Sequence, residues 1–217
     1  MNARAVFFDL DGTLVDSLED LTDAVNHVRE AFSLPLLAVD EVRPKIGKGG
    51  RNLMQQVLPD GTDADINHAL GLFLEFNRQH IADKSHLYPG IRETLLELAS
   101  QNIKMAVISN KNEDLSRKIL QALGVHDLFE DISGGDTYPE RKPSPLPLLN
   151  VVQKLGVVQD NCVMVGDSIN DIQAAHQANI ASIGCSWGYG SREELSGATV
   201  FSNSPHELRT AISATLR

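Results

Sequence analysis

The stretch Ala5–Thr13, with the sequence AVFFDLDGT, decides the fold of this chain of 217 residues. Its first four residues form an uninterrupted apolar run, which is typical of a strand that is buried on both faces of a sheet. Two aspartates and a glycine follow at once, so the strand ends in acidic side chains. Since ligands of open parallel sheets bind outside the carboxyl ends of the strands, these aspartates are candidates for a functional site.

Further short apolar runs recur along the chain, and most are followed by a helical pattern. The runs cover residues 104–108, 128–132, 162–165, 180–184 and 199–201. The helical patterns cover residues 91–100, 112–123, 144–156, 170–179 and 206–216. Capping residues support several of these helices, such as Asn112 at the start of one and Gly156 at the end of another. Alternating buried strands and helices predict the α/β class with a doubly wound parallel sheet.

One connection is far longer than the others. About eighty residues separate the first strand from the helix at Ile91, whereas a connection between a strand and the next helix usually has about two to six residues. Helical patterns cover residues 18–32, 51–58 and 63–81 within it. The sequence therefore predicts an inserted helical domain at residues 17–82, within a core that residues 1–16 and 83–217 form together.

Charge and composition exclude several classes of protein. The chain has 19 basic and 29 acidic residues and a formal net charge of −10, which argues against a nucleic-acid partner. No apolar run approaches the roughly 20 residues needed to span a bilayer, and the apolar run near the start is short for a secretory signal. Cys162 and Cys185 show neither metal-ligand spacing nor a disulfide framework. We therefore expect a cytoplasmic protein without a membrane partner.

Polar side chains gather where the predicted strands end. Asp9 and Asp11 follow the first strand, and Asp167 follows the run at 162–165, with Asp171 one helical turn later. Clustered carboxylates repel one another and are costly to desolvate unless a cation joins them. A few oxygen ligands, with room for water and a phosphate, suit Mg²⁺ better than a dedicated calcium cage. We expect Mg²⁺ as the cofactor.

Other strand-end residues complete a site for phosphoryl transfer. A phosphoryl group spreads negative charge over its oxygens, which the hydroxyl of Ser109 and the ammonium of Lys142 can stabilise. Asp9 can act as the nucleophile and form an aspartyl-phosphate. Asp11 can protonate the leaving alkoxide and then activate water against the acyl phosphate.

These residues resemble the motifs of the haloacid dehalogenase-like (HAD) hydrolase superfamily. Asp9–Ser17 resembles the first motif, Ser109 the second, Lys142 the third, and Gly166-Asp167 with Asp171 the fourth. The resemblance covers essentially the whole chain and implies a Rossmann-like parallel-sheet core, an inserted helical cap domain that sets substrate specificity, and Mg²⁺ dependence. It also implies that Asp9, Asp11 through its backbone carbonyl, and Asp167 are metal ligands, with Asp171 supporting them nearby. True dehalogenases of the superfamily lack the second aspartate, so Asp11 favours phosphate chemistry.

Several stretches are similar to the phosphoglycolate phosphatases within that superfamily. They are Gly135–Thr137, Arg141–Pro143, Gly166–Ser168 with Asp171 and Ile172, and Ser186–Tyr189. Asn179 departs from the pattern, since relatives commonly have glycine there, but asparagine also tolerates the left-handed conformation. Ser144 departs too, where many relatives have aspartate.

The cap is expected to select the substrate. The segment Ile46–Arg51 leads into a helix, and its glycine-freed amides with Lys48 and Arg51 could hold a small carboxylate. We count Lys48, Gly49, Arg51 and the core residue Asn110 as substrate-binding residues. The partner we expect is a small phosphorylated metabolite, most simply 2-phosphoglycolate, bound by a monomer or homodimer.

Three other functions use similar residues. A sugar-phosphate mutase of the β-phosphoglucomutase type, or a pyrophosphatase, would share the same core. A non-enzymatic phospho-switch resembling a receiver domain also pairs Asp, Ser or Thr, and Lys on an acidic sheet. Receivers carry the acceptor after a later strand and have no helical insert, whereas Asp9 follows the first strand.

Overall fold

The computed structural model describes residues 3–216, and a six-stranded parallel sheet forms its centre. The strands are β1 (Ala5–Phe8), β4 (Lys104–Ile108), β5 (Asp131–Ser133), β6 (Cys162–Gly166), β7 (Ala181–Cys185) and β8 (Val200–Ser202). Their order is β5-β4-β1-β6-β7-β8, so the chain builds outward from β1 to one edge and then continues from β6 to the other. The direction of winding reverses between β1 and β6, where open α/β sheets bind their ligands.

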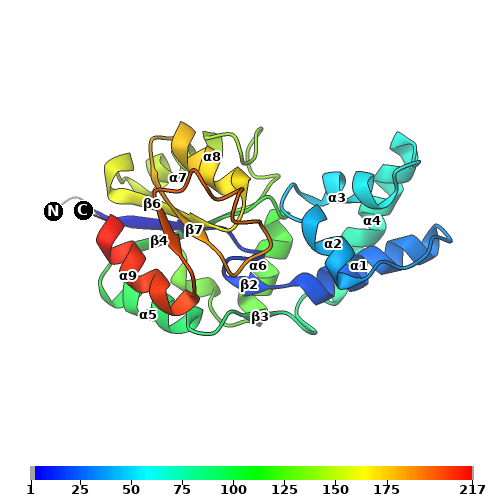
Figure 1. Ribbon diagram of the computed structural model, residues 1–217, viewed down its shortest axis with the longest axis horizontal. Helices are drawn as coiled ribbons and strands as arrows, with labels where there is room; N and C mark the ends of the chain where they lie inside the picture. The colour runs from blue at the N-terminus through cyan, green and yellow to red at the C-terminus, as the bar shows by residue number, and fades with distance from the viewer. Residues whose placement is uncertain (1–2, 217) are drawn as a thin grey trace.

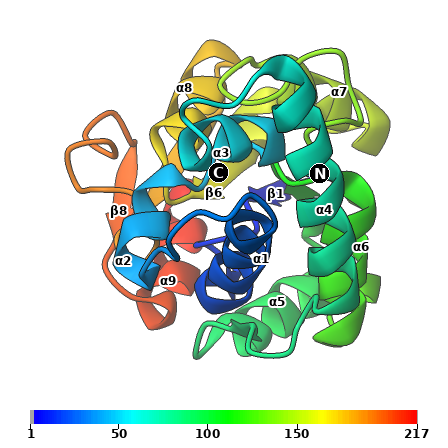
Figure 2. The same ribbon diagram turned by 90° about the vertical axis from the view of Figure 1, so that its right-hand side faces the viewer.

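Helices cover both faces of this sheet (Figures 1 and 2). They are α5 (Ile91–Ser100), α6 (Glu113–Ala122), α7 (Leu146–Leu155), α8 (Ile169–Gln177) and α9 (Pro205–Thr215). Val6 and Phe8 point to the face covered by α5, α6 and α9, and Ala5 and Phe7 point to the face covered by α7 and α8. Because side chains alternate along a strand, the continuous apolar run of β1 is needed to fill both cores.

A helical insertion lies between two short strands, β2 (Val15–Asp16) and β3 (His86–Leu87), which pair as an antiparallel ribbon. It contains α1 (Leu18–Ala31), α2 (Val39–Val42), α3 (Gly50–Val57), α4 (Asp63–Gln79) and the 3₁₀ turn η1 (Arg43–Lys45). These helices form a body beside the carboxyl edge of the sheet and have an apolar core of their own, which includes Val25, Met54 and Phe73 (Figure 1). We call this body the cap.

The elements agree closely with those expected from the sequence. The α/β class, the parallel sheet and the helical insertion are confirmed. The third apolar run is displaced, because residues 126–128 form a 3₁₀ turn (η2, His126–Leu128) and the strand begins at Asp131. Another such turn, η3 (Gln159–Asn161), precedes β6. The β2–β3 ribbon and α2 were not expected, since two to four residues are too few to show a periodic pattern.

One local expectation is also met. Asn179 has a φ of 54° and follows the end of α8, so asparagine takes the left-handed position there. Cys162 and Cys185 are free and buried, and burial raises the pKa of the Cys162 thiol to about 12.

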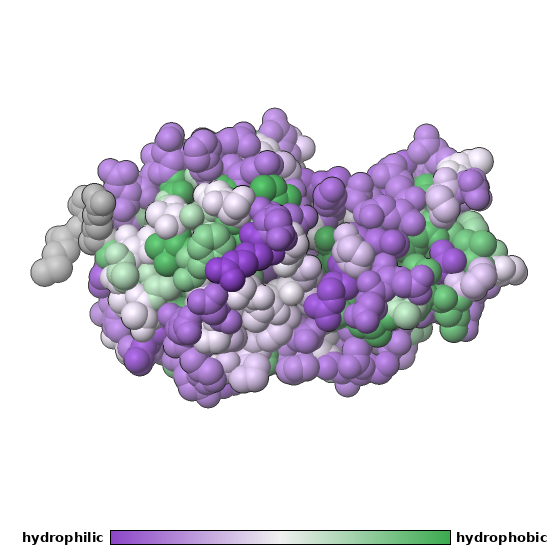
Figure 3. Space-filling model, viewed as in Figure 1, coloured by the Kyte–Doolittle hydropathy of each residue, from purple (hydrophilic) through white to green (hydrophobic). Residues whose placement is uncertain are grey.

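Hydrophilic side chains cover much of the face in Figure 3, and no helix in residues 3–216 is long and apolar enough to cross a membrane.

Candidate active site

Three buried carboxylates meet where β1 and β6 end. Asp9 follows β1, Asp167 follows β6, and Asp171 lies in the first turn of α8, with one oxygen from each within 4.8 Å of the others. The backbone fixes them: the amide of Asp9 donates to Val165 O (2.9 Å), which extends the pairing of the two strands. Asp171 accepts hydrogen bonds from the amide and hydroxyl of Ser168 (3.0 and 2.7 Å), so it also caps α8. The predicted convergence of these aspartates is therefore present.

One ammonium group faces this acidic cluster. Lys142 Nζ lies 2.6 Å from Asp171 Oδ1 and 3.1 Å from Asp9 Oδ1, and it also donates to the carbonyl of Ile108. Burial alone would lower the pKa of Lys142, but the two aspartates raise it above its ordinary value. Lys142 is therefore a charged residue held in the interior by its carboxylate partners.

The cluster keeps an excess of negative charge despite Lys142. Burial, with the nearby carboxylates of Asp9 and Asp171, raises the pKa of Asp167 to about 8. Burial also raises the pKa of Asp9 to about 6, although Lys142 opposes the shift. Asp9 Oδ1 is buried and makes no hydrogen bond of good geometry. Three carboxylates offer hard oxygen ligands, and Lys142 does not balance all of their negative charge. Such a group fits a divalent cation such as Mg²⁺.

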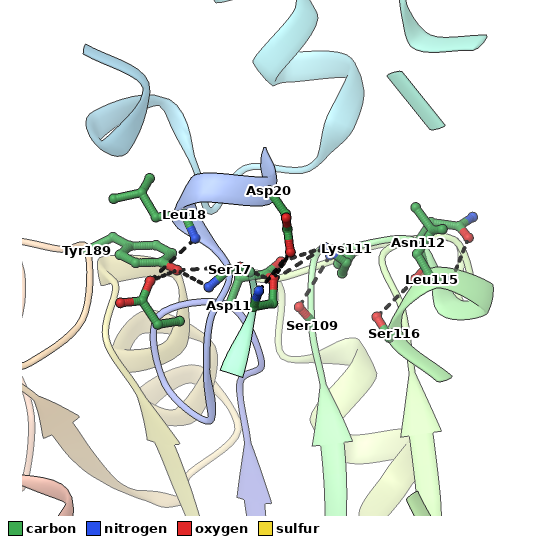
Figure 4. Close-up of polar contacts among 12 residues, drawn as sticks. Asp11, Ser17, Leu18, Asp20, Ser109, Lys111, Asn112, Leu115, Ser116 and Tyr189 are labelled. Atoms are coloured by element: carbon green, nitrogen blue, oxygen red, sulfur yellow. Dashed lines mark hydrogen bonds and ion pairs between the residues drawn. The ribbon is translucent and has the colours of Figure 1, made fainter. Parts of the chain in front are cut away.

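Asp11 is not one of the three clustered carboxylates, and its side chain lies between Ser17 and Lys111 at the start of the cap (Figure 4). Its carboxylate accepts a hydrogen bond from Ser17 Oγ (2.6 Å) and pairs with Lys111 Nζ (3.3 Å). The expected ligation through the Asp11 backbone carbonyl stays a prediction. The pairing with Lys111 was not foreseen, since Lys111 follows the second motif without belonging to it.

Ser109 and Asn110 occupy the end of β4. Ser109 Oγ accepts a hydrogen bond from the Lys111 amide (3.3 Å), and the side chain is buried beside Asp9 at the floor of a cavity. Asn110 Nδ2 donates to the carbonyls of Gly47 in the cap and Lys142 in the core, at 2.9 Å each. Asn110 thus ties the cap loop to the core, in addition to its predicted place at the site.

A cavity of about 300 Å³ opens above the aspartates, between core and cap. Asp9, Asp11, Ser109 and Asn110 form its polar floor, and Leu53, Leu70, Phe73 and Leu74 contribute an apolar wall from the cap. A phosphate ester bound here would have its phosphoryl group at the core and its leaving group against the cap.

The predicted cap residues differ in their positions. Gly49 and Arg51 line the cavity, whereas Lys48 is not among the lining residues. Arg51 Nη2 pairs with Asp63 Oδ1 (2.8 Å) and Nη1 donates to Asn67, so its charge is partly neutralised. Gly49 has a φ of +84°, a conformation that favours glycine.

Arg141 is a lining residue that the sequence did not single out as a binding residue. Its Nη1 lies 3.0 Å from the position that a Cβ atom on Gly49 would occupy. Within residues 3–216, its guanidinium makes no ion pair. The only sequence signal was its place immediately before Lys142.

Tyr189, after β7, fastens the start of the cap to the core (Figure 4). Its hydroxyl accepts a hydrogen bond from the amide of Ser17 (2.8 Å) and donates to Asp16 Oδ1 (3.2 Å). Its own amide donates to Asp167 Oδ2 (2.7 Å). One residue therefore connects the cap junction with the acidic cluster.

The fold and the site define a Rossmann-like enzyme with a helical cap, whose acidic centre suits a divalent cation. The chain belongs to the haloacid dehalogenase-like hydrolases, because the model of that family matches residues 6–185.

Relatives within the family share a more specific name. The chain is 40% identical over 210 residues to a phosphoglycolate phosphatase of Chromobacterium violaceum, covering 94% of each protein. It is also 40% identical to a phosphoglycolate phosphatase of Neisseria meningitidis, over 90% of this chain and 85% of that protein. A crystal structure of a predicted phosphoglycolate phosphatase from Haemophilus somnus superposes with a TM-score of 0.90, at 30% identity and with 97% and 98% of the two chains covered.

Proposed function

We propose that this hydrolase is a Mg²⁺-dependent phosphatase that cleaves 2-phosphoglycolate to glycolate and inorganic phosphate. The observation that carries the proposal is the placement of Asp9, next to Lys142 and two further carboxylates, at the floor of a cavity that the cap encloses. The shared name of the two relatives described above supports the choice of substrate.

The reaction proceeds in two displacements. A carboxylate oxygen of Asp9 attacks phosphorus and forms an aspartyl-phosphate, while the bond from phosphorus to the glycolate oxygen breaks and Asp11 gives that oxygen a proton. Asp11 then takes a proton from a water molecule, whose oxygen attacks the same phosphorus. Phosphate leaves, and Asp9 regains its carboxylate. The hydrogen bond from Ser17 Oγ holds Asp11 in place for both transfers.

Asp9 and Asp167 would hold the Mg²⁺ ion together with the backbone carbonyl of Asp11, and Asp171 would support them nearby. The bound ion supplies charge that stabilises a phosphoryl group in transfer. Lys142 holds Asp9 and Asp171 in position, and Ser109 offers its hydroxyl to a phosphoryl oxygen.

The substrate carboxylate would lie toward the cap. Gly49 presents a backbone amide at the start of α3, and Arg51 and Arg141 bring positive charge to the same cavity. Asn110 holds the Gly47 loop, and with it Gly49, against the core. Lys48 does not line the cavity, so it would attract the substrate only through long-range electrostatics.

Phosphate release from a panel of compounds tests the proposal. The panel contains 2-phosphoglycolate, ethyl phosphate, a hexose phosphate and pyrophosphate, each with and without Mg²⁺. We expect steady phosphate release that requires Mg²⁺, with the highest kcat/KM for phosphoglycolate. Turnover of the hexose phosphate only with a bisphosphate activator, or a preference for pyrophosphate, would instead identify one of the alternative enzymes on this core.

A further inference from the structure

Lys111 brings a buried ammonium group to the cavity between core and cap. Its side chain is only 7% exposed, and it lines the cavity together with Asp11. The backbone of Lys111 is fixed on both sides: its amide donates to Ser109 Oγ (3.3 Å), and its carbonyl accepts from the Gly135 amide (2.8 Å). Lysine side chains are almost never fully buried unless they are paired, so the partners of this ammonium group indicate its role.

The protein satisfies this ammonium group only in part. Lys111 Nζ lies 3.3 Å from both carboxylate oxygens of Asp11, whereas a charge-assisted hydrogen bond of this kind usually measures about 2.7–2.9 Å (Figure 4). Ser17 Oγ is the closer donor to the same carboxylate, at 2.6 Å. Within residues 3–216, Nζ makes no other hydrogen bond or ion pair. Because an ammonium group has three N–H donors, Lys111 keeps the capacity to bind an anionic ligand.

Its place beside Asp11 distinguishes Lys111 from the other cations of the cavity. Among the cavity-lining residues that the structure describes, the cations are Lys111, Arg51 and Arg141. Arg51 already has a carboxylate partner, and Arg141 lies against the loop at the start of α3. Lys111 is the cation that contacts Asp11, the residue proposed to give a proton to the leaving oxygen of the substrate.

The chemistry of 2-phosphoglycolate places its carboxylate close to that leaving oxygen. The carboxyl group is bonded to the same CH₂ carbon that carries the ester oxygen, so the two groups cannot lie far apart. When Asp11 is within hydrogen-bonding distance of the ester oxygen, the carboxylate therefore lies in the immediate surroundings of Asp11. Lys111 Nζ is already in those surroundings, with both oxygens of Asp11 at 3.3 Å.

We propose that Lys111 binds the carboxylate of 2-phosphoglycolate by donating an N–H of its ammonium group to one carboxylate oxygen. The inference rests on the proposed function and deepens it, because it assigns part of the recognition of the leaving group to a core residue beside the proton donor. Lys111 and Asp11 would then hold neighbouring parts of the same small molecule, which aligns the ester oxygen for proton transfer. The apolar wall residues Leu53 and Phe73 limit the water around this ion pair and so strengthen it.

The test compares two substrates of equal chain length that differ in the carboxylate. They are 2-phosphoglycolate and ethyl phosphate, in which a methyl group takes the place of the carboxylate. The quantity measured is the ratio of their kcat/KM values with Mg²⁺ present. We expect Lys111→Met to lower this preference for phosphoglycolate at least about tenfold, the effect of losing one hydrogen bond between charged groups. A loss common to both substrates reports on the position of Asp11 and cancels in the ratio.

Lys118 supplies a matched control. It lies in α6, has an ion pair with Asp114 (3.9 Å) and does not line the cavity. Lys118→Met makes the same substitution and the same change in net charge, so it should leave the substrate preference as in the wild type. Lys111→Gln removes the charge but keeps an N–H donor, so it should lower the preference less strongly than Lys111→Met. It also provides the main test if the methionine variant does not fold.

Three outcomes would overturn the inference. If kcat/KM falls equally for both substrates in Lys111→Met, the lysine only positions Asp11 or binds the phosphoryl group. If neither value changes, the carboxylate is bound elsewhere in the cavity. If Lys118→Met lowers the preference as much as Lys111→Met, the effect comes from the net charge of the enzyme. A wild-type enzyme that does not prefer phosphoglycolate to ethyl phosphate refutes the proposed substrate itself, before any variant is compared.

Discussion

The ammonium nitrogen of Lys142 lies 2.6 Å from Oδ1 of Asp171, and both side chains are almost completely buried. Asp171 also caps α8 through Ser168, so the same carboxylate joins a core helix to the ammonium group of Lys142. The folding of the sheet edge and the electrostatics of the active site therefore depend on one ion pair.

Removal of that cation should destabilise the metal-free protein. Lys142→Met keeps most of the side-chain volume but leaves Asp9 and Asp171 without a counter-charge, at an expected cost of about 3–5 kcal/mol. Urea unfolding without Mg²⁺ measures this loss, and phosphate release should fall with it. Lys84→Met is the matched control, because Lys84 pairs with Asp23 at the surface, where solvent screens the pair, and its loss should change the stability little. Equal losses in the two variants would contradict the account.

Replacement of Asp9 separates catalysis from folding. Asp9→Asn removes the nucleophile, so phosphate release should fall to the uncatalysed rate. The Tm of the metal-free variant should rise, because a carboxyl group whose pKa burial raises to about 6 becomes a neutral amide. Asp11→Asn should be slower than wild type by about 10²–10⁴-fold, the usual contribution of a general acid and base. Turnover by Asp9→Asn at the wild-type rate would refute the nucleophile assignment.

Elements with a repeated pattern were predictable from the sequence, and contacts between distant segments were not. The apolar run of β1 and the helical patterns of the cap indicated the fold, because burial on two faces and helical periodicity leave a local signature. The β2–β3 ribbon has only two residues in each strand and leaves none. The strand-end aspartates could be brought together from topology alone, since parallel strands end at one edge.

Side-chain pairing limited the prediction of the site. Arg51 was expected to be free for a ligand, but α4 begins with Asp63, which reaches its guanidinium. Lys111 was not foreseen, because its partner Asp11 lies 100 residues away in the chain.

The stability of the metal-free protein should decrease as the pH rises. Burial raises the pKa of Asp167 to about 8 in the folded state, well above the ordinary value for an aspartate. Between these two values the folded protein binds more protons than the unfolded chain, so stability is greatest at the acidic end and declines as Asp167 ionises. Thermal melts from pH 5 to pH 8 should therefore show a falling Tm in the presence of a chelator. Saturating Mg²⁺ should weaken this slope, because a bound cation favours the ionised carboxylates; an unchanged slope would argue against a metal at Asp167.

Arg141 should contribute more than Arg51 to recognition of the substrate carboxylate. The Arg51 guanidinium already pairs with Asp63. Its removal therefore takes a positive charge from the cavity but also leaves the Asp63 carboxylate without that partner, so the net effect on substrate binding should be small. Arg141 has no carboxylate partner within residues 3–216 and lies against Gly49, at the start of α3. Arg141→Ala should raise the KM for phosphoglycolate about tenfold or more, since a charge-assisted hydrogen bond is lost, and should leave the KM for ethyl phosphate nearly unchanged. Arg51→Ala should raise the KM for phosphoglycolate only a few-fold, and Lys48→Ala less still. The opposite order would mean that Arg51 exchanges Asp63 for the substrate when the cavity is filled.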